Sequence, residues 1–172
     1  MALDALRATP IFAEVPDEHL ERLAQQSIPM SVKAGEFLAV AGPSGSGKTT
    51  LTRLSPDATL LSDEISIVRL GAGGTACCYG SPFWGELGEA GRNAAVPLHA
   101  IHFLRHADRH GTTALTPRRA LASLLPNVLF FAAEPSLVAR VLDVAAGLVE
   151  RVPCFALGFR PEASVWEAIV DA

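Results

Sequence analysis

Apolar runs alternate with polar segments along the chain, and their spacing predicts strands and helices in alternation. Short apolar runs bounded by turn residues are typical of buried strands. They predict strands over residues 37–41, 59–64, 65–70, 77–80, 96–104 and 154–159. Apolar residues spaced three and four apart predict helices over residues 49–54, 117–125, 135–151 and 164–170. The pattern therefore predicts an α/β fold.

The longest helical pattern covers residues 135–151. Its apolar positions recur along one side of the helix, which favours packing against the core. They are Leu137, Val138, Val141, Leu142, Ala145, Leu148 and Val149.

Residues 1–34 form a predicted helical extension in front of a main domain that covers residues 35–172. A helix begins at Pro16 and runs to about Gln26, with Leu20 and Leu23 on one face. We expect such an amphipathic helix to pack on the main domain or on a partner.

Residues 42–49 fit the phosphate-loop (Walker A) pattern G-x-x-x-x-G-K-[ST]. The loop follows the predicted strand 37–41 and precedes the predicted helix 49–54, which is the expected context. Its glycines let successive backbone N–H groups point at phosphate oxygens, and the helix N-terminus attracts the same anion. The alternative is a glycine-rich turn without a ligand, which three glycines and a Lys-Thr pair make a poor explanation. The predicted phosphate-binding residues are Gly42, Pro43, Ser44, Gly45, Ser46, Gly47, Lys48, Thr49 and Thr50.

Two of these residues have side chains with defined chemistry. The Lys48 ammonium is a point charge for the β- and γ-phosphates, and the Thr49 hydroxyl is a ligand for Mg²⁺. The sequence therefore predicts binding of a nucleoside triphosphate, ATP in the first place, together with Mg²⁺.

Carboxylates follow the loop at the end of the predicted strand 59–64. Asp63 is a candidate metal ligand or general base, and Glu64 is its acidic neighbour. Glu86, on a loop with two aromatic residues, is a further candidate metal ligand. Trp84 of that loop either acts at the site, by stacking on a base or closing over it, or covers the core. The alternative for the carboxylates is a solvated strand end.

Residues 42–51 alone also resemble ABC-transporter ATPases. Those enzymes place their acidic strand much farther along the chain and carry an L-S-G-G-Q signature. Neither feature occurs here, so the sequence argues against that class.

Three segments together resemble HPr kinase/phosphorylase-related proteins of the phosphoenolpyruvate-carboxykinase-like type. They are the phosphate loop, the strand with Asp63 and Glu64, and residues 79–86; the likeness continues through residues 96–98, 103–104 and 157–161. The resemblance covers about residues 35–172. It implies a compact phosphate-loop domain and transfer of a phosphoryl group from ATP to a hydroxyl acceptor, with Lys48, Asp63 and Glu64 as catalytic residues. It also implies assembly of several copies of the chain.

The chain departs from that family because residues 28–40 contain no histidine before the phosphate loop. The acceptor, a small molecule or a protein or peptide, is therefore left open. A nucleotide-binding accessory or regulatory module without kinase activity is the alternative function.

About the first 37 residues resemble the opening of a cyclic-nucleotide-binding domain, through residues 6–13, 16–24 and 33–36. A β-roll with its phosphate-binding cassette does not follow. The segment is then a remnant of a fused regulatory domain, a gene junction or a coincidental helical lead-in, and we predict no cyclic-nucleotide site in it.

Composition and charge indicate which ligands and which cellular compartment we expect for this protein. The formal net charge is −4, which does not indicate a nucleic-acid-binding surface. Cys77, Cys78 and Cys154 form no C-x-x-C pair and suggest reduced thiols in a cytoplasmic protein. No apolar run is long enough to cross a membrane, and no signal peptide is recognised. Four histidines have no carboxylate or cysteine at compact ligand spacing, which favours solvated or loop positions over a zinc site. These histidines are His99, His102, His106 and His110.

Overall fold

In this computed structural model, the structure describes residues 16–19, 21, 38–71, 73–88, 90–130 and 134–170. The chain divides into two compact units, residues 1–31 and residues 32–172. Of the first unit, residues 17–19 and 21 are helical, and the His19 N–H donates to the Pro16 carbonyl at 3.0 Å. The rest of the predicted helix and the likeness to a cyclic-nucleotide-binding domain lie outside the described residues.

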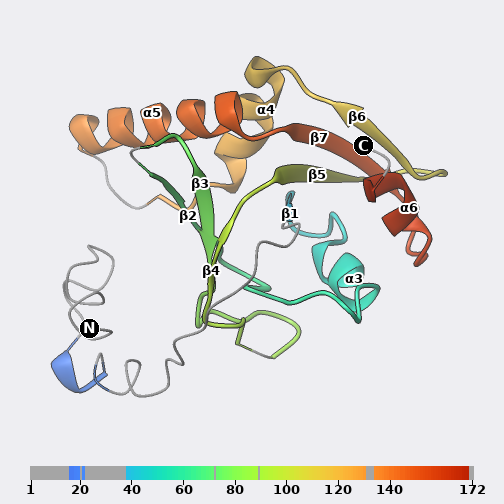
Figure 1. The fold of residues 1–172 in the computed structure, drawn as a ribbon, viewed down its shortest axis with the longest axis horizontal. Coiled ribbons are helices and arrows are strands. Elements are labelled where there is room, and N and C mark those ends of the chain that lie inside the picture. Colours follow the sequence, from blue (N-terminus) through green and yellow to red (C-terminus); the bar gives the residue numbers. More distant parts are fainter. Residues whose placement is uncertain are drawn as a thin grey trace. The chain divides into compact units, whose positions relative to one another are not determined.

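The second unit contains a four-stranded sheet with the order β1-β5-β7-β6 (Figure 1). Its strands are β1 (Leu38–Ala41), β5 (Ala100–His106), β6 (Gly111–Ala114) and β7 (Cys154–Phe159). β1, β5 and β7 are parallel, and β6 runs antiparallel to β7. β5 and β7 are the central strands, and their apolar sequences suit strands buried on both faces.

A second, three-stranded antiparallel sheet has the order β2-β3-β4. It consists of β2 (Ile67–Leu70), β3 (Ala76–Tyr79) and β4 (Ala95–Pro97). The two sheets together make the mixed α/β fold that the sequence predicts.

The predicted strand 96–104 is in fact two strands in different sheets. The Leu98 N–H still donates to Ala76 of the antiparallel sheet, at 2.8 Å. After His99 the chain enters β5 and pairs with β1 and β7. A continuous apolar run fits either sheet, so the sequence pattern did not reveal the crossing.

The prediction of a strand over residues 59–64 is wrong. The Leu60 carbonyl accepts from the Arg92 N–H at 2.7 Å, and the Leu61 carbonyl from the Ser81 N–H at 3.0 Å. The Ser62 hydroxyl then donates to the Ile65 carbonyl at 2.8 Å and accepts from the Glu64 N–H at 3.3 Å. This local bonding competes with a strand ladder, so the segment bends and its carboxylates lie on a turn.

In the described part of the second unit, four α-helices cover the faces of the four-stranded sheet. They are α3 (Lys48–Arg53), α4 (Pro117–Leu124), α5 (Pro135–Arg151) and α6 (Val165–Val170), with the short 3₁₀ helix η2 (Leu125–Asn127) after α4. α4 and α5 each begin with proline, whose fixed φ and missing N–H suit a first helical position. The predicted bounds of α5 and β7 are confirmed.

The core has two parts, one on each face of the sheet. Ile101 and Phe103 of β5 pack with α4, α5 and the antiparallel sheet. Leu104 of β5 packs with α3 and α6 on the other face. The helices therefore cover both faces, with α3, which follows the phosphate loop, on the second.

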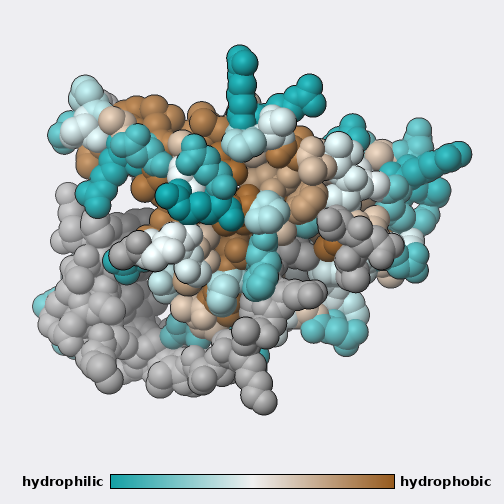
Figure 2. Space-filling view, turned by 45° about the horizontal axis from the view of Figure 1, so that its top comes forward, coloured by the Kyte–Doolittle hydropathy of each residue, from teal (hydrophilic) through white to brown (hydrophobic). Residues whose placement is uncertain are grey.

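The apolar stripe of α5 is only partly buried. Ala145, Leu148 and Val149 lie in the core. Leu137, Val138 and Leu142 are exposed, and Figure 2 shows apolar surface over this helix. The prediction of core packing is thus confirmed for the second half of the helix and wrong for the first. No helix within the described ranges is long and apolar enough to span a bilayer.

Candidate phosphate-binding site

The loop between β1 and α3 curls back on itself through two glycines and an internal hydrogen bond. Gly45 and Gly47 adopt positive φ values of 79° and 97°, and the Ser46 N–H donates to the Pro43 carbonyl at 3.1 Å. α3 is six residues long, so the loop amides rather than a long helix dipole provide most of the attraction for an anion. Several loop N–H groups have no hydrogen-bond partner among the described residues and are available as donors. They include those of Gly45, Gly47, Lys48 and Thr49.

Lys48 folds back across the opening of the loop. Its Nζ donates to the Gly42 carbonyl at 2.7 Å and to the Pro43 carbonyl at 3.1 Å. An ammonium group has three donors, so one remains for a ligand. These two bonds hold a positive charge next to the unpaired loop amides.

Phe159, at the end of β7, packs against the phosphate loop at Gly47. A Cβ atom on Gly47 would lie 2.5 Å from Cζ of Phe159, and a Cβ on Gly42 would lie 2.5 Å from Oγ of Ser46. The approach at Gly47 requires glycine, because the Phe159 ring is packed in the core and cannot move aside, whereas at Gly42 the nearest atom belongs to a serine hydroxyl that can rotate. The Ser46 hydroxyl is buried without a partner among the described residues.

His106, at the end of β5, reaches the same loop. Its Nε2 lies 2.9 Å from the Gly45 carbonyl oxygen. Its ring stacks on Phe159 with centroids 6.3 Å apart, as the ring of His102 stacks on Phe155 at 5.1 Å. The strand register places each histidine directly opposite its phenylalanine.

Sequence reasoning missed this role of His106 and Phe159. A signal was present, because both residues end apolar strands. β5 neighbours β1, the strand before the phosphate loop, and β7 is parallel to β5, so both strands end on the side of the sheet where the loop lies. His102 and His106 share one face of β5. His102, however, is a buried residue and not a loop histidine.

The Asp63 carboxylate is bound by backbone N–H groups of the loop over residues 82–87. Its two carboxylate oxygens accept from the Gly85 N–H at 2.6 Å and the Leu87 N–H at 2.9 Å. Glu64 is exposed and its carboxylate lies against Gly85, so both acids adjoin the loop over residues 82–87. Exposed Glu86 belongs to the same loop.

The structure therefore brings the predicted site residues together in two groups. One group is the phosphate loop with Lys48, and the other is Asp63 and Glu64 with the loop that carries Trp84 and Glu86. No hydrogen bond or ion pair in the described part of the chain joins the acidic group to Lys48 or Thr49. Across the described ranges, no cluster of three or more His, Cys, Asp or Glu residues has metal-binding geometry.

The 82–87 loop presents Trp84 to solvent, with 61% of the side chain exposed. The hydrogen bonds to Asp63 hold the backbone on both sides of Glu86. Trp84 is thus not a covering of the core, which was one of its two predicted roles.

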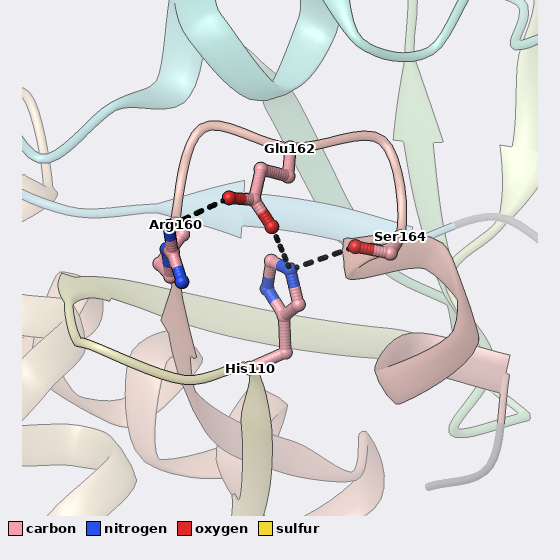
Figure 3. A network of polar contacts seen from close by, with 4 residues as sticks. All are labelled: His110, Arg160, Glu162 and Ser164. Carbon is pink, nitrogen blue, oxygen red and sulfur yellow. Dashed lines mark hydrogen bonds and ion pairs between the residues drawn. The ribbon is translucent and has the colours of Figure 1, made fainter.

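A second polar cluster joins the turn after β7 to the start of β6 (Figure 3). Arg160 pairs with Glu162 at 2.9 Å, and Nε2 of His110 lies 3.1 Å from Oγ of Ser164 and 3.9 Å from Glu162. A histidine that activates a serine is oriented by a carboxylate at its other ring nitrogen. Here Nδ1 of His110 is buried without a partner among the residues described. The cluster therefore stabilises the turn after β7, and Arg160 contributes an ion pair to it.

One cavity lies between α5 and the turn after β2. Its volume is about 290 Å³, and none of the predicted site residues lines it. Its lining residues are Leu70, Gly71, Gly74, Arg140, Asp143, Val144, Gly147 and Arg151.

Comparison with known proteins gives one local similarity. No family model matches the chain, and no solved structure matches it. A stretch of 35 residues is 63% identical to an ATP-dependent lipid A-core flippase from Ralstonia nicotianae, which is 20% of this chain and 6% of the flippase. The chain thus matches a small fraction of that protein's length. A short segment of it resembles part of an ATP-dependent protein.

Proposed function

We propose that this protein binds ATP with Mg²⁺ at residues 42–50 and transfers the γ-phosphoryl group to a hydroxyl acceptor. The observation that carries the proposal is the loop that binds its own lysine: the Lys48 ammonium donates to the Gly42 and Pro43 carbonyls, and the same loop retains unpaired N–H groups. The local similarity to an ATP-dependent flippase and the resemblance to HPr kinase-related proteins support it.

The residues present fit a triphosphate. The N–H groups of Gly45, Gly47, Lys48 and Thr49 would donate to phosphate oxygens, and Lys48 would neutralise their charge. The Thr49 hydroxyl, next to Lys48, would hold Mg²⁺, which supplies charge neutralisation at the phosphates.

Asp63 would act as a partner of that metal or as the base for the acceptor hydroxyl. Each of its carboxylate oxygens accepts one backbone hydrogen bond and retains a lone pair for a further contact. Through the same bonds Asp63 positions the loop with Trp84 and Glu86. Glu64 and Glu86, both exposed, are then available to the acceptor or the metal.

A second candidate function is a nucleotide-binding module without kinase activity. It is favoured by the engagement of both Asp63 oxygens with backbone N–H groups, and by the lack of an ion pair between Asp63 and Lys48 in the described ranges. Assembly of several copies, which the family resemblance implies, belongs to the proposal and is tested by sedimentation velocity.

The first experiment titrates ATP with Mg²⁺ into the wild type and into Lys48→Ala, with calorimetry and thermal shift together. We expect Lys48→Ala to weaken binding by about 30-fold or more, because a charge-assisted contact worth roughly 2 kcal/mol is lost. Arg53→Ala is the matched control, since it removes a positive charge from the exposed end of the same helix. Wild type that binds no ATP would refute the proposal.

A second experiment separates kinase from module. Turnover that disappears in Asp63→Asn while ATP still binds supports the kinase. ATP binding without transfer to any small hydroxyl compound or peptide supports the module. A parallel titration with cAMP tests whether residues 1–37 provide a cyclic-nucleotide site.

A further inference from the structure

The contact between His106 and Gly45 connects two segments that are 61 positions apart in the sequence. β1 and β5 are parallel neighbours, and Ala41 at the end of β1 lies opposite Phe103. β5 continues to His106 beyond that point. The strand next to the phosphate loop therefore extends past the loop's first residue and places a histidine beside it.

The orientation of the His106 ring is set by a core residue. The ring stacks on Phe159 with an interplanar angle of 18°. Phe159 is 2% exposed and lies under Gly47. One phenylalanine thus supports the loop and the histidine that contacts it.

The contact fixes the direction of one peptide group. In a trans peptide the C=O and the following N–H point in opposite directions. With the Gly45 oxygen bonded to His106, the Ser46 N–H must point the other way, and it donates to the Pro43 carbonyl inside the loop. Gly45 is exposed at φ 79°, and a Cβ there would meet no atom within 4 Å. Local packing around Gly45 therefore does little to prevent rotation of this peptide.

We propose that His106 is a positioning residue for the phosphate loop, and that it acts by donating Nε2–H to the Gly45 carbonyl. A carbonyl oxygen only accepts, so the ring carries a proton on Nε2. His106 holds the peptide between Gly45 and Ser46, and with it the internal bond from Ser46 to Pro43 that shapes the loop carrying the unpaired N–H groups, and it makes no contact with the nucleotide itself. The inference rests on the proposed function, because its consequence is measured as ATP affinity.

Two variants separate the donor from the ring. His106→Phe keeps a ring to stack on Phe159 but has no N–H. His106→Gln supplies an N–H donor without the ring. We expect the Kd for ATP with Mg²⁺ to rise about tenfold in His106→Phe, as for the loss of one hydrogen bond, and to stay within about threefold of the wild type in His106→Gln. His99→Phe, at an exposed position before β5, is the control and is expected to leave the Kd unchanged.

A second measurement uses the nucleotide-free protein. Amide hydrogen exchange of residues 45–48 is expected to speed up in His106→Phe, while exchange in α5 and the melting temperature stay as in the wild type. Recovery by His106→Gln in both measurements supports the positioning role. If both variants lose the same amount of ATP affinity and also melt at a lower temperature, His106 has a purely structural role and the positioning proposal is overturned.

The outcomes distinguish the two proposals. If the wild type binds ATP and His106→Phe binds it equally well, this inference is wrong and the proposed function stands. If the wild type binds no ATP, the proposed function fails first and this inference fails with it.

Discussion

Phe159 fills the space that any side chain on Gly47 would need. A Cβ on Gly47 would lie 2.5 Å from Cζ of Phe159 and 2.9 Å from its Cε1. Phe159 is buried in the core with Leu51, Leu104 and Leu157, so it has little freedom to move. The last glycine of the phosphate loop is therefore required by a residue near the other end of the chain.

We expect Gly47→Ala to abolish ATP binding and to lower stability. An alanine at φ 97° costs about 1–2 kcal/mol, and the contact with Phe159 adds to that cost. The measurements are urea unfolding and ATP calorimetry. Gly73→Ala is the control, because a Cβ there would meet no atom within 4 Å. If the Gly47→Ala protein binds ATP and has normal stability, the packing of Phe159 does not restrict the residue after Ser46.

We expect Asp63→Asn to loosen the 82–87 loop. An asparagine side chain has one acceptor oxygen where the carboxylate uses two, so one of the bonds to Gly85 or Leu87 is lost. A hydrogen bond to a charged group contributes about 1.5–3 kcal/mol, and the half-buried position places the effect near the lower value. Urea unfolding measures the loss, and the fluorescence anisotropy of Trp84 reports the loop in a Trp166→Phe background.

Glu64, the exposed neighbour of Asp63, provides the control for Asp63→Asn. Glu64→Gln removes the same charge one residue further along, and the side chain accepts no backbone hydrogen bond in the described structure. Equal effects of the two variants would mean that net charge, and not the contacts of Asp63, determines the behaviour of the loop.

We expect stability to fall as the pH drops below about 6.5, through His102. Burial lowers the pKa of His102, so the folded state favours the neutral ring. The unfolded chain binds the proton near pH 6.5, and the stabilisation present above that pH is lost as the pH falls toward the folded pKa. Unfolding free energies at pH 7.5 and pH 5.5 measure the slope. His102→Phe is expected to make the slope shallower, and an unchanged slope would assign it to other groups.

We expect the three thiols to differ in reactivity. Burial raises the pKa of Cys154 to about 11 and also raises the pKa of Cys78, whereas Cys77 is half-buried. Only thiolates react, so iodoacetamide at pH 8 should label Cys77 first, and the other two after unfolding in urea. Tandem mass spectrometry locates the label. Rapid labelling of Cys154 in the folded protein would contradict its position in the core.

The raised pKa of Cys154 also gives a stability trend at high pH. The folded state favours the protonated thiol, so its contribution is complete below pH 9 and is lost as the pH rises toward 11. Cys154→Ala or Cys154→Val should remove that part of the pH dependence.

The sequence by itself determined what depends on neighbours along the chain. The phosphate loop, the bounds of α5 and β7, and the helix starts at Pro117 and Pro135 follow from local spacing and backbone preferences. These features need only the conformational freedom of glycine, the fixed φ of proline and the repeat of apolar positions.

Tertiary structure decided what depends on residues far apart in the sequence. Residues 59–64 look like a strand, but Leu60 and Leu61 bond two different segments and Ser62 bonds its own turn. Residues 96–104 look like one strand, but they cross between two sheets. The partners of His106, Phe159 and Asp63 are likewise set by sheet order and loop packing. The sequence pattern shows whether a residue is apolar or polar. The order of the strands in the sheets determines which other residues it contacts.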